Sequence, residues 1–201
     1  MKIEKITFKK NKYELTFSDG SFLMVEEDTL VALGLYKGME IEDPFIDKIR
    51  RHNQKTQGIN HALRYLQSLR TEQQVRNYLY KKKIDSIIVE EVIDYLVEKH
   101  YIDDYDYGLR YLSDAQKLKG YGRKKIGHML RQKGLKSSLI DHILLELDEE
   151  LEFHNCMKLG KKHLKDSKNS KEIHKTFRFL MGRGYDYEMI ERVMEKICGK
   201  E

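Results

Sequence analysis

The chain has few of the residues that cross-link, break or anchor a protein. Of its 201 residues, two are cysteine (Cys156 and Cys198) and one is proline (Pro44). Two such cysteines match neither a disulfide framework nor a zinc pattern, so we expect reduced thiols in a cytoplasmic protein. The single early proline leaves all later helices unbroken. No run approaches the ~20 apolar residues of a membrane helix, and the first residues do not resemble a signal peptide, which predicts no membrane contact.

Catalytic and metal-binding motifs are also missing. The sequence has no GxxxxGK[ST] phosphate loop and no GxSxG elbow. His154 and Cys156 with His163 have no matching second ligand pair, so Cys156 is interpreted as a small packing residue. The acidic run at 103–108 lacks the ligand spacing of a calcium loop. We therefore predict no catalytic residues, no metal and no cofactor, and hence a protein that is not an enzyme.

A small β structure is predicted at residues 1–42. Two strand-like runs flank the Asp-Gly turn at 18–21, which is a strong hairpin signal, and residues 33–42 suggest a further short strand. An isolated hairpin is barely stable in water, so this β-hairpin cap must pack against helices. A linking helix is expected at 43–58, because proline is well tolerated at a first helical position.

The rest of the chain repeats itself. Residues 77–96, 128–147 and 178–197 align without gaps, and their apolar residues recur at i, i+4, i+5, i+8 and i+12, one face of a helix. This predicts a mainly α protein with three tandem three-helix repeats in an elongated curved array. The first repeat is expected at 59–103, the second at 104–152 and the third at 153–201. Their helices are expected near 59–69, 72–82, 86–99, 104–117, 122–133, 137–151, 153–165, 170–182 and 186–198.

Local signals support these helix boundaries. Gly134 and Gly184 lie where the second helix of a repeat turns into the third, a place that favours left-handed backbone. Lys83 occupies the same place in the first repeat, so that turn must differ or be strained. The residues expected to cap helix starts are Thr71, Asp103 and Asn169.

The charge pattern repeats as well. Thirty-five per cent of residues are charged, with a net charge of only +5, but residues 117–136 hold eight Lys or Arg and no acid, and 137–152 hold six acids and no Lys or Arg. Lys81–Lys83 precede an acidic helix in the same way, and 161–175 hold six Lys against two acids. Pairing between neighbouring helices explains part of this pattern, although exposed pairs contribute only ~0–1 kcal/mol each. Acidic third helices argue against insertion of that helix into a DNA groove.

The basic segments are the candidate binding surface. Tyr121 lies among basic residues between Gly120 and Gly122, and we expect these glycines to let a partner approach the backbone closely. Such a surface suits phosphate or a nucleoprotein. The predicted filament- and nucleic-acid-binding residues are Lys81, Lys82, Lys83, Lys119, Tyr121, Arg123, Lys124, Lys125, Arg131 and Lys133.

Several segments resemble the RecX family of bacterial recombination regulators. They are "ALRYLQSLRTEQQVRNYLYKK" (62–82), "YIDDYDYGLRYL" (101–112) and "KGYGRKKIGHMLRQKGL" (119–135). The resemblance implies a non-enzymatic modulator that binds the RecA recombinase on single-stranded DNA, within the helical groove of the filament. It also implies limits on filament growth, ATPase activity, strand exchange and repressor cleavage, and so a role in DNA repair, recombination and the SOS response. The family supplies no catalytic residues.

Two other functions fit the residues alone. One is a sequence-nonspecific binder of single-stranded nucleic acid, and the other is a helical-repeat scaffold whose charges serve solubility only. Both signs of charge on one body fit a nucleoprotein better than naked DNA, and repeated units gain from several weak contacts made together. An open array with two capped ends suggests a monomer.

Overall fold

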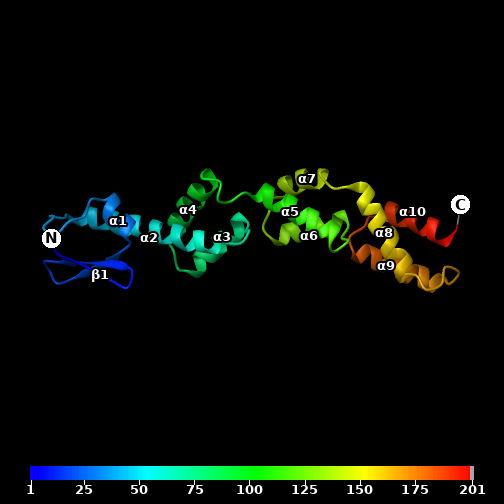
Figure 1. Cartoon of the computed structure of the whole chain (residues 1–201), viewed down its shortest axis with the longest axis horizontal. Coiled ribbons are helices and arrows are strands. Elements are labelled where there is room, and N and C mark those ends of the chain that lie inside the picture. Colours follow the sequence, from blue (N-terminus) through cyan, green and yellow to red (C-terminus); the bar gives the residue numbers. More distant parts are fainter. Residues whose placement is uncertain (200–201) are drawn as a thin grey trace. The chain divides into compact units, whose positions relative to one another are not determined.

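A computed structural model of the chain describes residues 1–199 and is mainly helical, with a small antiparallel sheet at the N-terminus (Figure 1). The prediction of a mainly α protein with a small β structure at the N-terminus is thereby confirmed. The chain divides into two compact units, the first ending at Ile102 and the second beginning at Asp103. The last two residues of the predicted third repeat, 200–201, lie outside the described residues. The elements are β1 (Ile3–Lys9), β2 (Lys12–Phe17), β3 (Phe22–Val25), α1 (Glu27–Ala32), α2 (Asp43–Tyr65), α3 (Glu72–Lys81), α4 (Ser86–Glu98), α5 (Asp104–Lys117), α6 (Arg123–Gln132), α7 (Ser137–Leu145), α8 (Glu149–His163), α9 (Ser170–Gly182) and α10 (Tyr187–Cys198).

The N-terminal cap is a three-stranded meander rather than a hairpin. The strands β1, β2 and β3 follow one another in an antiparallel sheet, and the Asp-Gly turn joins the last two as predicted. The additional strand β1 turns back through Lys10 and Asn11, which both have positive φ. The strand expected at 33–42 is reduced to a single bridge between Lys2 and Glu40. One face of the sheet, with Leu15 at its centre, packs against α2.

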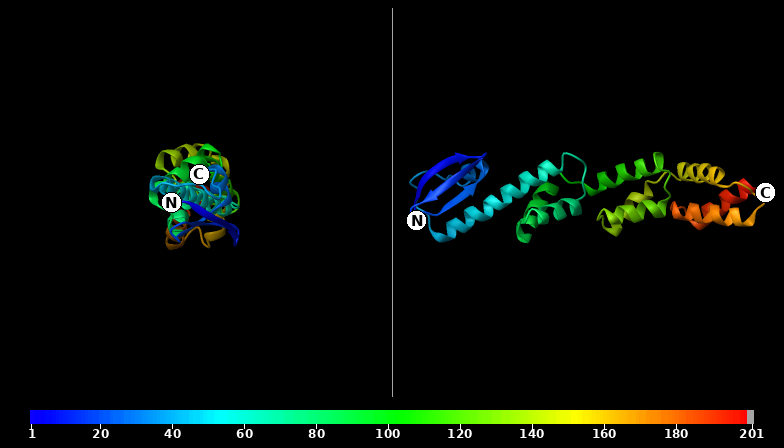
Figure 2. Two further views of the ribbon diagram at one scale, coloured as in Figure 1. Left: turned by 90° about the vertical axis from the view of Figure 1, so that its left-hand side faces the viewer. Right: turned by 90° about the horizontal axis from the view of Figure 1, so that it is seen from below.

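The break predicted at Gly58 is wrong, because α2 runs uninterrupted through the linking segment into the first repeat (Figure 2). Pro44 stands in its first turn, as expected. Gly58 is buried, and a Cβ placed on it would lie 2.9 Å from a methyl group of Val92 in α4. The glycine therefore serves close packing between two helices rather than a chain reversal.

Each three-helix repeat has its own apolar core. The first repeat is formed by the end of α2 with α3 and α4, the second by α5–α7 and the third by α8–α10. Leu79, Leu130 and Leu180 occupy equivalent places in the three cores, and all are fully buried. The gapless alignment of the sequence thus corresponds to equivalent packing positions. Within the described residues, no helix is long and apolar enough to cross a membrane.

The turns between the second and third helices share one backbone conformation. Gly134 and Gly184 have φ of 93° and 95°, and Lys83 has φ of 60°. Of the two alternatives left open for this turn, the strained one is therefore observed, because a side chain disfavours this region of φ. Asp103 and Asn169 cap their helices through the side chain, and Thr71 forms a full capping box with Gln74.

Candidate functional site

The glycines of the basic motif hold the second and third repeats together. The backbone N–H of Gly122 donates to the carbonyl oxygen of Arg183 at 3.0 Å, and the N–H of Lys124 donates to that of Gly184 at 3.0 Å. Gly122 is buried at this junction. The expectation that Gly122 lets an external partner approach is therefore wrong, because the chain's own third repeat occupies that place. The name junction is used below for this contact between the α5–α6 turn, the α9–α10 turn and α8.

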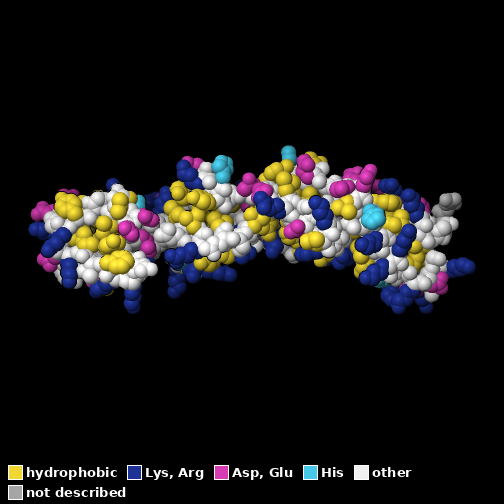
Figure 3. Space-filling model, viewed as in Figure 1, with side chains coloured by type: hydrophobic (Ala, Val, Ile, Leu, Met, Phe, Trp, Pro, Cys, Tyr) yellow, Lys and Arg dark blue, Asp and Glu magenta, His cyan; other side chains and the backbone are white. Residues whose placement is uncertain are grey.

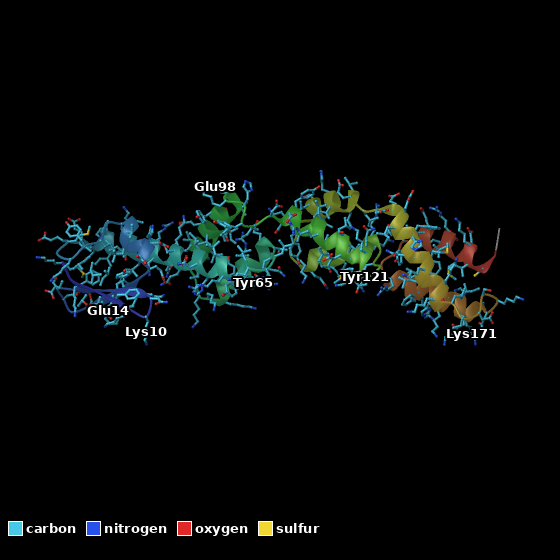
Figure 4. The ribbon with its side chains drawn as sticks, in the orientation of Figure 1. Lys10, Glu14, Tyr65, Glu98, Tyr121 and Lys171 are labelled. Carbon is cyan, nitrogen blue, oxygen red and sulfur yellow. The ribbon has the colours of Figure 1, made fainter. Side chains whose placement is uncertain are left out.

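Tyr121 belongs to the same junction (Figure 4). The Arg183 guanidinium lies 4.7 Å from the centre of the Tyr121 ring, and the Lys125 ammonium lies 5.5 Å from it. The Tyr185 hydroxyl donates to the carbonyl oxygen of Gly120 at 2.8 Å. The half-buried Tyr121 ring is therefore engaged by cations of the chain itself, and is a poor platform for stacking a nucleic-acid base.

Arg123 and Lys125 also make internal contacts. The backbone N–H of Arg123 donates to Glu152 Oε1 at 2.6 Å, and its guanidinium pairs with Glu149 at 3.1 Å. The Lys125 ammonium donates to the carbonyl oxygen of Gly182 at 3.3 Å. Internal pairing, one of the two explanations left open by the charge pattern, thus accounts for these two residues.

Glu152 is a buried carboxylate, only 2% exposed, at the centre of the junction. Burial raises its pKa above the ordinary value, while the hydrogen bond from the Arg123 backbone opposes this effect. The position of Glu152 one turn into α8 lets it accept from the first residue of α6. No sequence signal identified this role, because it depends on a contact between residues 29 positions apart.

The other cations of the second repeat point to solvent. Lys119, Lys124 and Arg131 are exposed, and within residues 1–199 none of them forms an ion pair. Lys133 is half-buried and has contacts of its own. Three of the predicted residues here are therefore able to receive an anion.

Lys81, Lys82 and Lys83 form a second exposed group, at the end of α3 in the first unit. The Lys82 ammonium lies 5.4 Å from the centre of the Tyr78 ring, and that ring stacks on Tyr65. None of the three lysines pairs with a carboxylate in the described part of the chain. Two acids of α4 pair with bases on other helices instead, Glu90 with Arg76 and Glu91 with Arg51.

The residues first considered as metal ligands are engaged otherwise. Cys156 is fully buried, and burial raises the pKa of its thiol to about 12. The His163 ring stacks on Phe179 at 4.3 Å, and its Nδ1 lies 2.9 Å from the Thr176 hydroxyl. Over residues 1–199, no three His, Cys, Asp or Glu side chains gather in a way that suits a metal ion.

Comparisons with known proteins agree with this architecture. A family model described as the RecX first three-helix domain matches residues 59–96, and one described as the RecX third three-helix domain matches 149–194. A solved structure titled as regulatory protein RecX superposes with a TM-score of 0.81 at 26% identity, covering 96% of this chain and 98% of the other. A RecX structure from Lactobacillus salivarius has a TM-score of 0.69 at 24% identity, covering 73% of this chain and 97% of that one, and supports the fold alone.

Relatives from other bacteria match along nearly the whole chain. The regulatory protein RecX of Streptococcus uberis is 31% identical over 203 residues, which span 96% of this chain and 76% of the relative. The regulatory protein RecX of Clostridium tetani is 30% identical over 202 residues, spanning 98% and 93%. With three-helix domains, sequence and structure all in agreement, the chain belongs to the RecX family.

Proposed function

We propose that the chain regulates the RecA recombinase by binding the filament that the recombinase forms on single-stranded DNA, in the groove of that filament. Its relatives carry the name of a regulatory protein, and the family resemblance supplies the recombinase as the partner. The observation that carries the proposal is the pair of exposed cationic groups, Lys81–Lys83 and the set of Lys119, Lys124 and Arg131, which form no ion pair with any residue from 1 to 199. The effect on the filament is mainly inhibitory.

The exposed acids favour a filament over naked DNA. Asp141 and Glu146 of α7, and Asp94 and Glu98 of α4, are exposed in the repeats that carry the cationic groups. A partner made of phosphate alone would meet repulsion from these carboxylates, whereas a nucleoprotein offers both DNA and basic protein loops. Opposite charges on each repeat therefore suit a mixed surface.

Repeated units also suit a repeated target. The first repeat presents Lys81–Lys83 near the turn between its second and third helices, and the second repeat presents Lys119 and Lys124 around the start of α6 and Arg131 near its end, so that two weak contacts form together. The proposal includes no catalytic step and no cofactor, and it places a monomeric protein in the cytoplasm. A nonspecific binder of single-stranded nucleic acid is the alternative, since the same cations attract any phosphate backbone.

Association with three targets separates the two functions. Fluorescence anisotropy is measured with single-stranded DNA alone, recombinase alone and the assembled filament. The filament regulator binds the filament more tightly than either component, whereas equal affinity for DNA with and without recombinase contradicts the proposal and supports the alternative.

A matched pair of variants tests the surface. The first carries Lys119→Gln, Lys124→Gln and Arg131→Gln, and the control carries Lys5→Gln, Lys37→Gln and Lys48→Gln, three exposed lysines of the first unit. Both lose the same charge. We expect weaker filament binding by the first variant alone, and equal effects in both would contradict the assigned residues.

A further inference from the structure

The third repeat carries a cationic surface that the predicted site leaves out. Between residues 153 and 178 the chain has eight Lys or Arg and two acids. The net charge of this segment, eight minus two or +6, is larger than the net charge of +5 of the whole chain. Figure 3 shows Lys and Arg side chains gathered over α8 and around the turn that follows it. Within the described residues, the one ion pair in this segment joins Lys175 to Glu172 at 3.8 Å. The name α8–α9 surface is used for the exposed cations Lys158, Lys161, Lys162, Lys165, Lys168, Lys171, Lys175 and Arg178.

The cations of α8 form one stripe. Lys158, Lys161 and Lys162 follow at i, i+3 and i+4 in α8, whereas Cys156 and Gly160 face the core, and Lys165 lies two residues beyond the end of the helix. This spacing places the three cations of α8 on one helical face within ~6 Å of axis. That length is shorter than the Debye length of ~10 Å at 0.1 M salt, so their potentials reinforce one another.

The cations of α9 continue the surface. Lys171, Lys175 and Arg178 follow at i, i+4 and i+7 on its exposed face, and α8 and α9 pack against each other. Figure 4 labels Lys171 near the turn between the two helices. Bases at the end of α8 suit the helix dipole, but Lys171 at the start of α9 opposes it. Helix stabilisation therefore does not explain this half of the surface.

The surface has charge without exposed apolar area. Between residues 153 and 178 every large hydrophobic side chain is at least half-buried, and the ring of Phe179 just beyond is stacked on His163. A protein partner is normally met by a patch with an apolar core, and base stacking needs an exposed ring. Lysines alone suit the phosphate backbone, which is recognised by charge and without regard to sequence.

We infer that the α8–α9 surface binds the phosphate backbone of single-stranded DNA directly, independently of the exposed cations at α6. The inference deepens the proposed function, on which it rests for its biological setting, because it assigns the contact with DNA to the third repeat. The second repeat is then left for the recombinase or for additional DNA contacts. No base preference follows from a surface of this kind.

The test compares two variants of the full chain. One carries Lys161→Gln, Lys165→Gln and Lys168→Gln, which make no ion pair in the described residues, and the other is the control with Lys5→Gln, Lys37→Gln and Lys48→Gln. Thermal unfolding first confirms that both variants fold. Affinity for an oligo(dT) strand is then measured between ~50 and ~200 mM salt, with an oligo(dA) strand as a check on base preference.

The expected result is a loss of about tenfold or more in DNA affinity at low salt for the α8–α9 variant relative to the control, with the slope of log affinity against log salt reduced by about 2. Equal affinity and slope in both variants would overturn the inference. So would a loss of filament binding with unchanged binding to free DNA, because the lysines would then serve a protein surface. Failure of the wild-type chain to prefer the filament over DNA would refute the proposed function alone, whichever result the variants give.

Discussion

Gly122 and Gly184 meet backbone to backbone across the junction. A Cβ placed on Gly122 would lie 2.6 Å from the carbonyl carbon of Gly184, and one placed on Gly184 would lie 2.3 Å from the backbone nitrogen of Lys125. The two residues are far apart in sequence, and neither side has room for even a methyl group. Their contact explains why glycine recurs at both turns.

The first prediction concerns this contact. Gly122→Ala should lower the free energy of unfolding by about 1–3 kcal/mol, because the added Cβ meets backbone that must move. Gly182→Ala is the control, since a Cβ there meets nothing within 4 Å. Urea unfolding followed by circular dichroism measures both. Equal stability of the two variants would mean that the junction is looser than the contact implies.

At Lys83 a substitution is predicted to stabilise the protein instead of destabilising it. Lys83→Gly should raise the free energy of unfolding by about 1 kcal/mol, because glycine adopts φ of 60° without the steric cost that lysine bears. Lys82→Gly loses the same charge at a residue with φ of −81°, so it should be destabilising or neutral. The pair is compared by thermal and urea unfolding. A loss of stability on Lys83→Gly would contradict the strain.

The buried carboxyl group of Glu152 should make the stability of the folded state depend on pH. Its folded-state pKa is raised, mainly by burial, so the folded state keeps a proton that the unfolded state releases first. This group therefore contributes a loss of stability as pH rises from its ordinary value near 4.5 through the raised folded value. Glu152→Gln keeps an oxygen that accepts from the Arg123 N–H but cannot ionise. Relative to wild type, this variant should gain stability as pH rises through that window.

The measurement for Glu152 is the difference in unfolding free energy between wild type and variant across the acid range. Only the difference is informative, because the other carboxyls titrate in both proteins. Glu152→Ala is the companion variant, and it should lose about 1–3 kcal/mol by leaving the Arg123 N–H unsatisfied. A difference that stays constant with pH would show that Glu152 does not titrate differently on folding.

Two double reversals separate structural cations from exposed ones. Arg123→Glu with Lys125→Glu should lower stability by about 1–3 kcal/mol, since the new carboxylates replace a cation–π contact and face Glu149. Lys119→Glu with Lys124→Glu makes the same change of charge at exposed side chains and should stay within about 0.5 kcal/mol of wild type. Equal losses would show that Arg123 and Lys125 do not support the junction.

The fold was largely predictable because its signals are local. Apolar spacing placed Leu79, Leu130 and Leu180 in equivalent cores, and the turn position of Lys83 left open either a different turn or the strained left-handed backbone that is observed. The end of the linking helix was wrongly predicted at Gly58, because in a sequence a glycine needed for close helix packing looks the same as one that ends a helix. That distinction depends on Val92, which lies in another helix.

The candidate site was only partly predictable. Exposed cations such as Lys81 and Lys124 were identified by charge alone, whereas Tyr121 and Arg123 were placed on the binding surface although they belong to the junction. Charge and aromatic content do not reveal which side chains meet Arg183, about sixty residues later. The helical spacing of Lys158, Lys161 and Lys162, followed by further lysines, was a usable signal for the α8–α9 surface.

The most direct test of the proposed regulation is the rate of ATP hydrolysis by recombinase assembled on single-stranded DNA, titrated with the full chain. A regulator that binds the filament should reduce the rate of ATP hydrolysis when far less than one molecule of it is present per recombinase subunit. The variant with Lys119→Gln, Lys124→Gln and Arg131→Gln should require a higher concentration for the same reduction. Turnover that remains unchanged at equimolar protein would contradict the proposed function.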